Sequence, residues 1–151
     1  NNFFSNKLSK ELLKKFNKPD LVVANNVLAH VPDVNDLLKG IVNILSEEGV
    51  ITIEFQHLYN IVKKIQFDTI YHEHFSYFSL IAISNIFKSI GLKIWHVEEI
   101  PTHGGSLRVY ASHDNSKHNM NKSVNKIISK EIKLGLNKLS FFVISSQKRL
   151  A

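Results

Sequence analysis

The 151-residue sequence contains no cysteine, so it has neither a disulfide framework nor a thiolate metal site. No apolar run approaches the ~20 residues that a membrane-spanning helix needs, so we expect no membrane association. The first residues lack the basic end, apolar stretch and small-residue cleavage site of a signal peptide. These absences together predict a cytoplasmic protein.

Glycine is also scarce, with six residues in the whole sequence. A nucleotide-binding sheet normally opens with a strand, a glycine-rich turn and a helix, and no such turn occurs here. The only adjacent glycines, Gly104 and Gly105, stand at a hairpin-like position late in the sequence. Because the chain also starts inside a predicted helix, we expect it to be the middle or later part of a larger protein.

The net charge is +6 and the sequence pI is about 9.5, but only two of the basic residues are arginines. The lysines are scattered over all segments, often beside asparagine. No basic stripe alternates with aromatic side chains that would stack on bases, so we do not expect nucleic-acid binding. The pattern gives no indication of the oligomeric state.

The spacing of apolar residues predicts alternating helices and strands, which favours a parallel sheet covered by helices. Ser5 and Asp33 are candidate N-caps, and Gly91 is a candidate helix end. The last two strands are close together along the chain and are expected to form an antiparallel hairpin. The predicted helices are 5–17, 34–45, 58–66, 81–90 and 123–150, the last of which is expected to be interrupted near Gly135 and Asn137. The predicted strands are 21–24, 50–55, 92–100 and 106–113.

The segment TIYHEHFSYFSL at 69–80 is the strongest candidate site, because two histidines, a glutamate and several aromatic residues occur together. In an extended segment residues two apart share a face, so His72 and His74 are expected to point into one cavity. A neutral histidine suits proton abstraction near pH 7. Two alternatives stay open: metal ligation together with another histidine, and loop histidines without a role.

Two further clusters accompany it. NNVLAH at 25–30 follows the first strand, at the sheet edge where ligands bind in open α/β sheets. THGGSLR at 102–108 has two glycines that allow a ligand to approach the backbone, and Arg108, which offers a fork for phosphate or carboxylate. The alternatives are an ordinary asparagine-rich loop and a β-turn followed by a solvated arginine.

Four motifs in this order, ANNVLAHVPD, GVITIEF, FDTIYHEHFSYFSL and THGGSLRVYAS, resemble the sugar C-methyltransferases. These are class I enzymes that use S-adenosyl-L-methionine to methylate nucleotide-linked keto-deoxysugars. The resemblance covers residues 15–113, and more weakly 114–151. It implies the second half of a Rossmann-like methyltransferase sheet, with parallel strands and a C-terminal antiparallel hairpin, over residues 1–113. Residues 114–151 would then be a linker and the helical start of a C-terminal substrate domain.

The resemblance also assigns roles to residues of this sequence. His74 would be the general base, Tyr71 and Glu73 would place the sugar or the base, and His30 would lie near the reacting centre. No metal ligand is implied within this chain, since the zinc-binding domain of the family lies in the missing N-terminal part. The residues implied to bind cofactor are Asn25, Asn26 and Val27, and those implied to bind substrate are His72, His103, Gly104, Gly105 and Arg108.

The expected chemistry is methylation at a carbon beside a ketone. A histidine removes the acidified proton, donors near the ketone oxygen stabilise the enolate, and the enolate carbon takes the methyl group. The aromatic residues Phe75, Tyr77 and Phe78 are expected to keep water away. Two other functions stay open: a hydrolase or lyase with a histidine-bound metal, and a non-catalytic ligand-binding relative.

Overall fold

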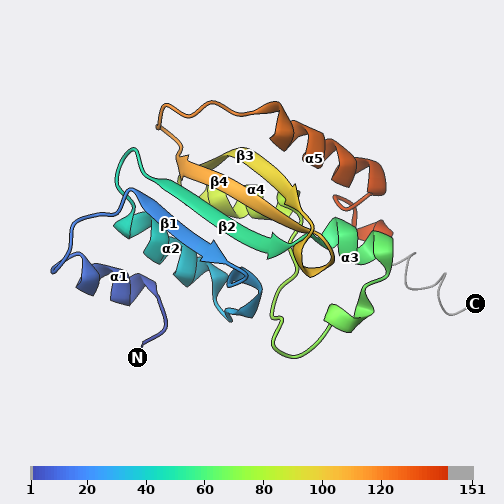
Figure 1. Ribbon diagram of the computed structural model, residues 1–151, viewed down its shortest axis with the longest axis horizontal. Coiled ribbons are helices and arrows are strands. Elements are labelled where there is room, and N and C mark those ends of the chain that lie inside the picture. Colours follow the sequence, from blue (N-terminus) through green and yellow to red (C-terminus); the bar gives the residue numbers. More distant parts are fainter. Residues whose placement is uncertain (1, 143–151) are drawn as a thin grey trace, which may run out of the picture.

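The computed structural model describes residues 2–142 and shows one four-stranded sheet with the strand order β1-β2-β4-β3 (Figure 1). β1 pairs in parallel with β2, while β4 runs antiparallel to both β2 and β3. The expected parallel start and C-terminal hairpin are therefore confirmed. The strands are β1 (Leu21–Asn25), β2 (Val50–Gln56), β3 (Leu92–Ile100) and β4 (Ser106–His113).

The helices lie where the apolar spacing predicted them, with different ends. Ser5 and Asp33 act as N-caps, because their side chains accept from the backbone N–H groups of Leu8 and Asp36. α1 is shorter than predicted, because residues 13–16 form turns instead of continuing the helix. The helices are α1 (Asn6–Leu12), α2 (Val34–Ile44), α3 (Leu58–Lys64), α4 (Leu80–Ser89) and α5 (Lys122–Leu134), with 3-10 turns η1 (Leu28–His30), η2 (Phe67–Thr69) and η3 (Thr102–Gly104).

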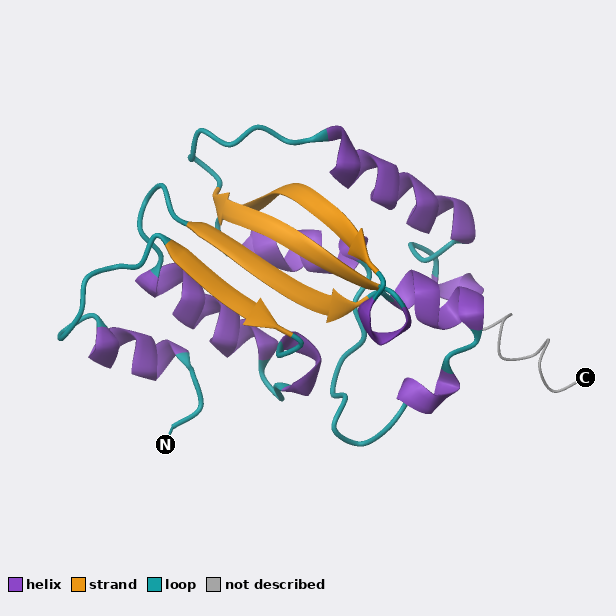
Figure 2. Cartoon of the chain, viewed as in Figure 1, coloured by secondary structure: helices purple, strands orange, loops and turns teal. Residues whose placement is uncertain are grey.

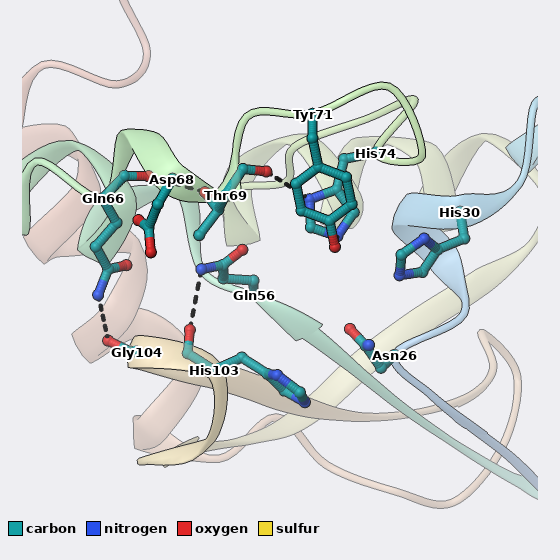
Figure 3. A pocket seen from close by; sticks show the side chains of 10 residues that line it. All are labelled: Asn26, His30, Gln56, Gln66, Asp68, Thr69, Tyr71, His74, His103 and Gly104. Carbon is teal, nitrogen blue, oxygen red and sulfur yellow. Dashed lines mark hydrogen bonds between the residues drawn. The ribbon is translucent and has the colours of Figure 1, made fainter.

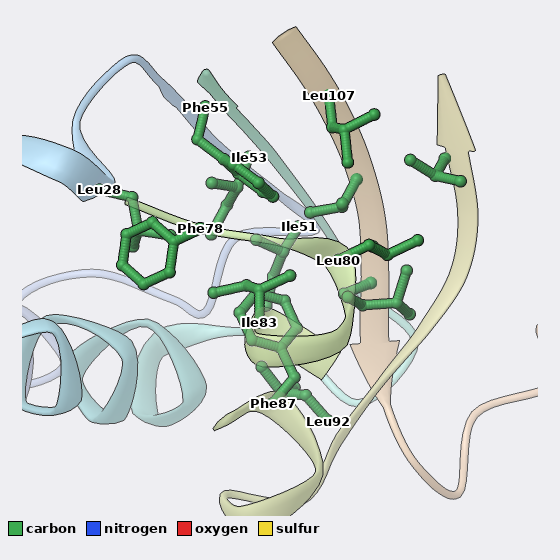
Figure 4. Packing of buried hydrophobic residues seen from close by; sticks show 14 of the residues in the cluster. Leu28, Ile51, Ile53, Phe55, Phe78, Leu80, Ile83, Phe87, Leu92 and Leu107 are labelled. Atoms are coloured by element: carbon green, nitrogen blue, oxygen red, sulfur yellow. The ribbon is translucent and has the colours of Figure 1, made fainter. Parts of the chain in front are cut away.

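The core forms between one face of the sheet and the helices α2 and α4, which lie behind the sheet in Figure 2. Alternation along the strands places Ile51, Ile53 and Phe55 on this face, and all three are almost completely buried. Phe87 of α4 packs into the same cluster (Figure 4). The opposite face is more exposed: the side chains of Leu21 and Val23 are 57% and 56% exposed.

The predicted interruption of the helical stretch 123–150 near Gly135 is confirmed. α5 ends at Gly135, whose φ of +93° is the left-handed conformation that favours glycine. α5 packs against β3 and α4. Residues 139–142 are helical again, as predicted, and residues 143–150 lie outside the described residues.

Within residues 2–142, none of the helices has both the length and the apolar character needed to cross a bilayer.

Candidate active site

A cavity of about 440 Å³ lies at the carboxyl ends of β1 and β2, between the loop that follows each strand and the turn η3 (Figure 3). This is the edge at which open α/β sheets bind ligands. Three separate segments of the chain contribute side chains to it. The lining residues are Asn26, His30, Gln56, Gln66, Asp68, Thr69, Tyr71, His74, His103 and Gly104.

His74 is held on both sides of its ring. Its Nδ1 atom lies 2.8 Å from the carbonyl oxygen of Thr69, and its Nε2 atom lies 3.1 Å from the hydroxyl of Tyr71. The rings of Tyr71 and His74 are 4.2 Å apart between centroids, and the ring of His30 is 4.7 Å from that of His74. The predicted base thus faces the cavity with its orientation fixed by its neighbours.

His72 does not share the cavity with His74, so the expectation that both imidazoles point into one cavity is wrong. The segment is not extended: the backbone N–H of His74 donates to the carbonyl of Tyr71 and closes a turn. The turn sends the side chain of His72 outward, where it is 90% exposed. The carboxylate of Glu73 is also exposed, at 66%, and lies 4.0 Å from Nε2 of His72.

The loop after β1 brings Asn26 and His30 to the cavity. Asn26 has a φ of +54°, in the left-handed region that asparagine tolerates better than most residues, and its backbone N–H donates to the carbonyl of Glu54. The Nδ1 atom of His30 lies 3.1 Å from the carbonyl oxygen of Glu73. Glu73 therefore contributes its backbone to the site. Asn25 and Val27 are exposed and do not line the cavity.

The turn η3 forms the opposite wall with His103 and Gly104. His103 has a φ of +51°, and its carbonyl accepts from the side-chain amide of Gln56 at 2.9 Å. Side chains of this chain come close to the two glycines: a Cβ atom on Gly104 would collide with Gln66, and one on Gly105 would lie 2.5 Å from Nδ2 of Asn60. The glycines are thus needed to pack η3 against the segment that follows β2.

Arg108 projects from β4 outside the cavity lining and is held by two carboxylates. Its Nη2 atom is 3.1 Å from Glu54, and its Nη1 atom is 4.0 Å from Glu98. The hydrogen bond to Glu54 raises the pKa of Arg108 above its ordinary value. Glu54 also accepts from the hydroxyl of Thr102 at 2.9 Å, so this ion pair supports the start of η3.

Tyr110 belongs to the same group of side chains. Its hydroxyl donates to Glu98 at 3.0 Å. Burial raises the pKa of Tyr110, and the neighbouring Glu98 carboxylate raises it further, because both disfavour the phenolate.

Comparison with known proteins places the chain among methyltransferases. Residues 1–97 match the family model described as a methyltransferase domain, and residues 101–148 match one described as a C-methyltransferase C-terminal domain. The chain belongs to the methyltransferase domain family, and its last third matches the C-terminal domain of C-methyltransferases. It is 33% identical over 133 residues to the C-methyltransferase NovU of Streptomyces niveus. That match covers 88% of this chain but 32% of the relative, so the chain spans about a third of the length of that protein.

Solved structures show that the chain has the class I methyltransferase fold. A SAM-dependent methyltransferase from Anabaena variabilis ATCC 29413 superposes with a TM-score of 0.55 and 10% identity, covering 75% of this chain and 56% of that chain. Magnesium protoporphyrin IX methyltransferase from Synechocystis PCC 6803, solved with bound SAH, gives a TM-score of 0.50 and 18% identity. That superposition covers 68% of this chain and 48% of the other.

Four residues that line the cavity were not predicted as site residues: Gln56, Gln66, Asp68 and Thr69. Gln56 is the last residue of β2. A polar residue at the carboxyl end of a parallel strand could have been predicted from the sequence as a site residue. Thr69 contributes its backbone carbonyl. Every residue type has this group, so the sequence could not identify Thr69 as a site residue. Gln66 and Asp68 precede the histidine motif and reach the cavity because of the path of the chain.

The aromatic residues after His74 separate in three directions. Tyr77 stays with the site: its ring meets that of His74 edge-on at 5.8 Å, and its hydroxyl donates to the carbonyl of Thr69 at 3.3 Å. Phe78 turns into the core, where it packs against Phe55. Phe75 is 58% exposed and lines a different, apolar cavity. The expectation that all three enclose the reacting centre is therefore wrong for Phe75 and Phe78.

A metal centre is not formed by the histidines of this region. Within residues 2–142, no three histidine, aspartate or glutamate side chains converge in a way that would hold a metal ion. His74 and His30 lie close together, but His72 points away from both.

Proposed function

We propose that this protein is an S-adenosyl-L-methionine-dependent C-methyltransferase that methylates a carbon beside a ketone in a nucleotide-linked deoxysugar, with His74 as the base. The match of residues 101–148 to a C-methyltransferase C-terminal domain and the 33% identity to NovU support the reaction class. One observation carries the mechanism: Nδ1 of His74 is occupied by the Thr69 carbonyl, while Nε2 faces the cavity beside the hydroxyl of Tyr71.

The cofactor site would begin at the loop after β1. Asn26 brings a side-chain amide to the cavity at the carboxyl end of that strand, where the amino-acid end of the cofactor would be bound. The solved Synechocystis relative of the same fold contains SAH, which supports this cofactor class for the present chain. When bound, S-adenosyl-L-methionine supplies an electrophilic methyl group on a sulfonium centre.

The proton step follows from the tautomer of His74. A carbonyl oxygen can only accept, so Nδ1 carries the hydrogen and Nε2 of the neutral ring keeps its lone pair. Nε2 removes a proton from the carbon beside the ketone of the substrate. The hydroxyl of Tyr71, whose single hydrogen can point either to Nε2 of His74 or to the substrate, is placed to donate toward the ketone oxygen, where the negative charge of the enolate develops.

The remaining walls of the cavity position the two reactants. Holding the enolate carbon in line with the methyl group supplies much of the rate, since good orientation is worth about 7–11 kcal/mol in favourable cases. His103 and Gly104 on the turn η3 face the loop that carries Tyr71 and His74 across the cavity, and they would contact the sugar. Within the proposal the expected partner is a small nucleotide-sugar, and the expected location is the cytoplasm.

The test separates proton abstraction from methyl transfer. In the whole protein, His74→Ala should abolish both methyl transfer and the exchange of the substrate's α-hydrogen with deuterated water, while cofactor binding by calorimetry is retained. A matched control is His118→Ala, because His118 stacks on Trp95 away from the cavity and should keep both activities. Retained hydrogen exchange in His74→Ala would reject His74 as the base.

A further inference from the structure

Segment 58–79, which carries His74, begins and ends at neighbouring positions of the fold. We call these two positions, His57 and Leu80, the neck. The segment leaves directly after β2 at His57 and returns at Leu80, the first residue of α4. His57 and Phe78 form an isolated parallel bridge, and the N–H of Leu58 donates to the carbonyl of Phe78 at 2.9 Å. The two ends of segment 58–79 thus lie side by side, and His74 lies on the loop between them.

One carboxylate contacts both ends of segment 58–79. Oε1 of Glu131, on α5, lies 2.7 Å from Nε2 of His57 and accepts from the N–H of Leu80 at 2.5 Å. Its Oε2 atom accepts from the N–H of Ile81 at 2.8 Å. The side chains of Glu131 and His57 are both completely buried. Nδ1 of His57 is buried without a hydrogen-bond partner among residues 2–142, so Glu131 is the polar anchor of this ring.

This arrangement joins the two parts of the chain that match different family models. His57 and α4 lie in the part matched as a methyltransferase domain, whereas Glu131 lies in the part matched as a C-methyltransferase C-terminal domain. A buried carboxylate that accepts from a helix N-terminus and from a histidine is strongly held, because each donor would otherwise be buried without a partner. The contact therefore fixes α5 against the neck in one position.

The neck also supports the opposite wall of the cavity. The N–H of His57 donates to the carbonyl of Gly105 at 3.1 Å, directly after the turn η3. Gln56, the preceding residue, lines the cavity and donates to the carbonyl of His103. A displacement of His57 would move this wall together with the loop that carries His74.

We propose that Glu131 is a positioning residue for the reaction: from α5 it clamps both ends of segment 58–79 and so sets the place of His74 against the turn η3. The proposal rests on the function proposed above for its catalytic consequence, but the clamp itself is a property of the fold. Glu131 does not touch the cavity. Its effect is exerted through His57 and through the first turn of α4.

The test compares Glu131→Gln with Glu99→Gln in the whole protein. Both changes remove one carboxylate that connects α5 to the rest of the fold, since Glu99 on β3 pairs with Lys130 at 2.6 Å. Glu99 is exposed, however, and its ion pair with Lys130 involves neither His57 nor the first turn of α4. In Glu131→Gln, amide hydrogen exchange over residues 58–79 should rise by about 10-fold, the effect of losing a charge-assisted hydrogen bond. Exchange in Glu99→Gln should match the wild type.

The kinetic readout should separate positioning from binding. We expect kcat of Glu131→Gln to fall by about 10- to 100-fold, as a small misplacement of a catalytic group does, with an unchanged dissociation constant for S-adenosyl-L-methionine. Unchanged exchange over 58–79, or a loss of kcat without faster exchange there, overturns the clamp. If exchange rises as expected but the wild type transfers no methyl group, the clamp stands and the proposed function fails.

A second variant keeps the test decisive if Glu131→Gln does not fold. His57→Leu leaves the carboxylate on the N-terminus of α4 and removes the side-chain donor only at the outgoing end of segment 58–79. Amide exchange should then rise over residues 57–66 and stay unchanged over 79–82. Equal exchange rates at both ends in this variant and the wild type would refute the clamp.

Discussion

The Nδ1 atom of His74 lies 2.8 Å from the carbonyl oxygen of Thr69, five residues earlier in the same loop. This contact sets which nitrogen of the ring carries the hydrogen, because a carbonyl can only accept. The same carbonyl also accepts from the hydroxyl of Tyr77, so one backbone group organises two side chains of the site. The base nitrogen is thereby left to face Tyr71 and the cavity.

The tautomer is directly measurable. We expect nitrogen-15 NMR of the neutral His74 ring to show a protonated Nδ1 and an unprotonated Nε2, because Thr69 accepts only from the former. His118, which stacks on Trp95 and makes no such contact, serves as an internal reference. A neutral His74 ring protonated at Nε2 would contradict the assignment.

Tyr71→Phe should lower kcat while the fold is retained. The change removes the hydroxyl 3.1 Å from Nε2 of His74 and keeps the ring that packs at 4.2 Å. If the hydroxyl assists proton transfer, kcat should fall by about 10²-fold with little change in cofactor affinity.

Tyr77→Phe is the matched control for this change. It also deletes one hydroxyl beside His74, but that hydroxyl donates to the Thr69 carbonyl at 3.3 Å and does not contact the imidazole nitrogens. Its effect on kcat should be clearly smaller. Equal losses in the two variants would argue against a specific role for Tyr71.

Gly105→Ala should destabilise the protein more than Gly91→Ala does. Both glycines have positive φ, +122° and +80°, which costs an alanine about 1–2 kcal/mol. Only at Gly105 would the new Cβ atom collide with a neighbour, Nδ2 of Asn60, which adds about 1–3 kcal/mol of overpacking. The free energy of unfolding in urea measures the difference, and equal values for the two variants would contradict the packing of η3.

The stability of the protein should decrease at alkaline pH through Tyr110. Burial and the Glu98 carboxylate raise its pKa above the ordinary value of 10.0, so the folded state holds the phenol proton more tightly than the unfolded state does. This contribution is fully present below pH 10 and is lost as pH rises through the folded pKa. Ultraviolet titration of tyrosinate should show one late-ionising phenol, which is absent in Tyr110→Phe.

The sequence predicted the framework well because local patterns encode it. The alternation in residues 50–55 and 106–113 identifies the buried face of each strand, and the caps at Ser5 and Asp33 mark helix starts. The resemblance to C-methyltransferases added the fold class, which the solved relatives confirm. The ends of the helices were less predictable, as in α1, because residues 13–16 remain compatible with a further helical turn.

The site was predicted only in part, because its geometry depends on contacts between distant segments. A single turn closing at His74 sends His72 to the surface, and an alternation rule for extended chains cannot anticipate it. Arg108 was expected to bind substrate, but in the fold it pairs with Glu54, which lies more than fifty residues earlier. Its proposed contact with substrate remains a prediction.

The amino-acid sequence by itself determined which segments form helices and strands and that the protein resembles the C-methyltransferases, because apolar period and motif order are local properties. The tertiary structure alone decided which histidine faces the cavity, which carbonyl holds it, and that Glu131 contacts His57 and Leu80 at the two ends of segment 58–79. Those features depend on backbone groups and on packing across the fold, where the direction of a side chain is set by partners far away in the sequence.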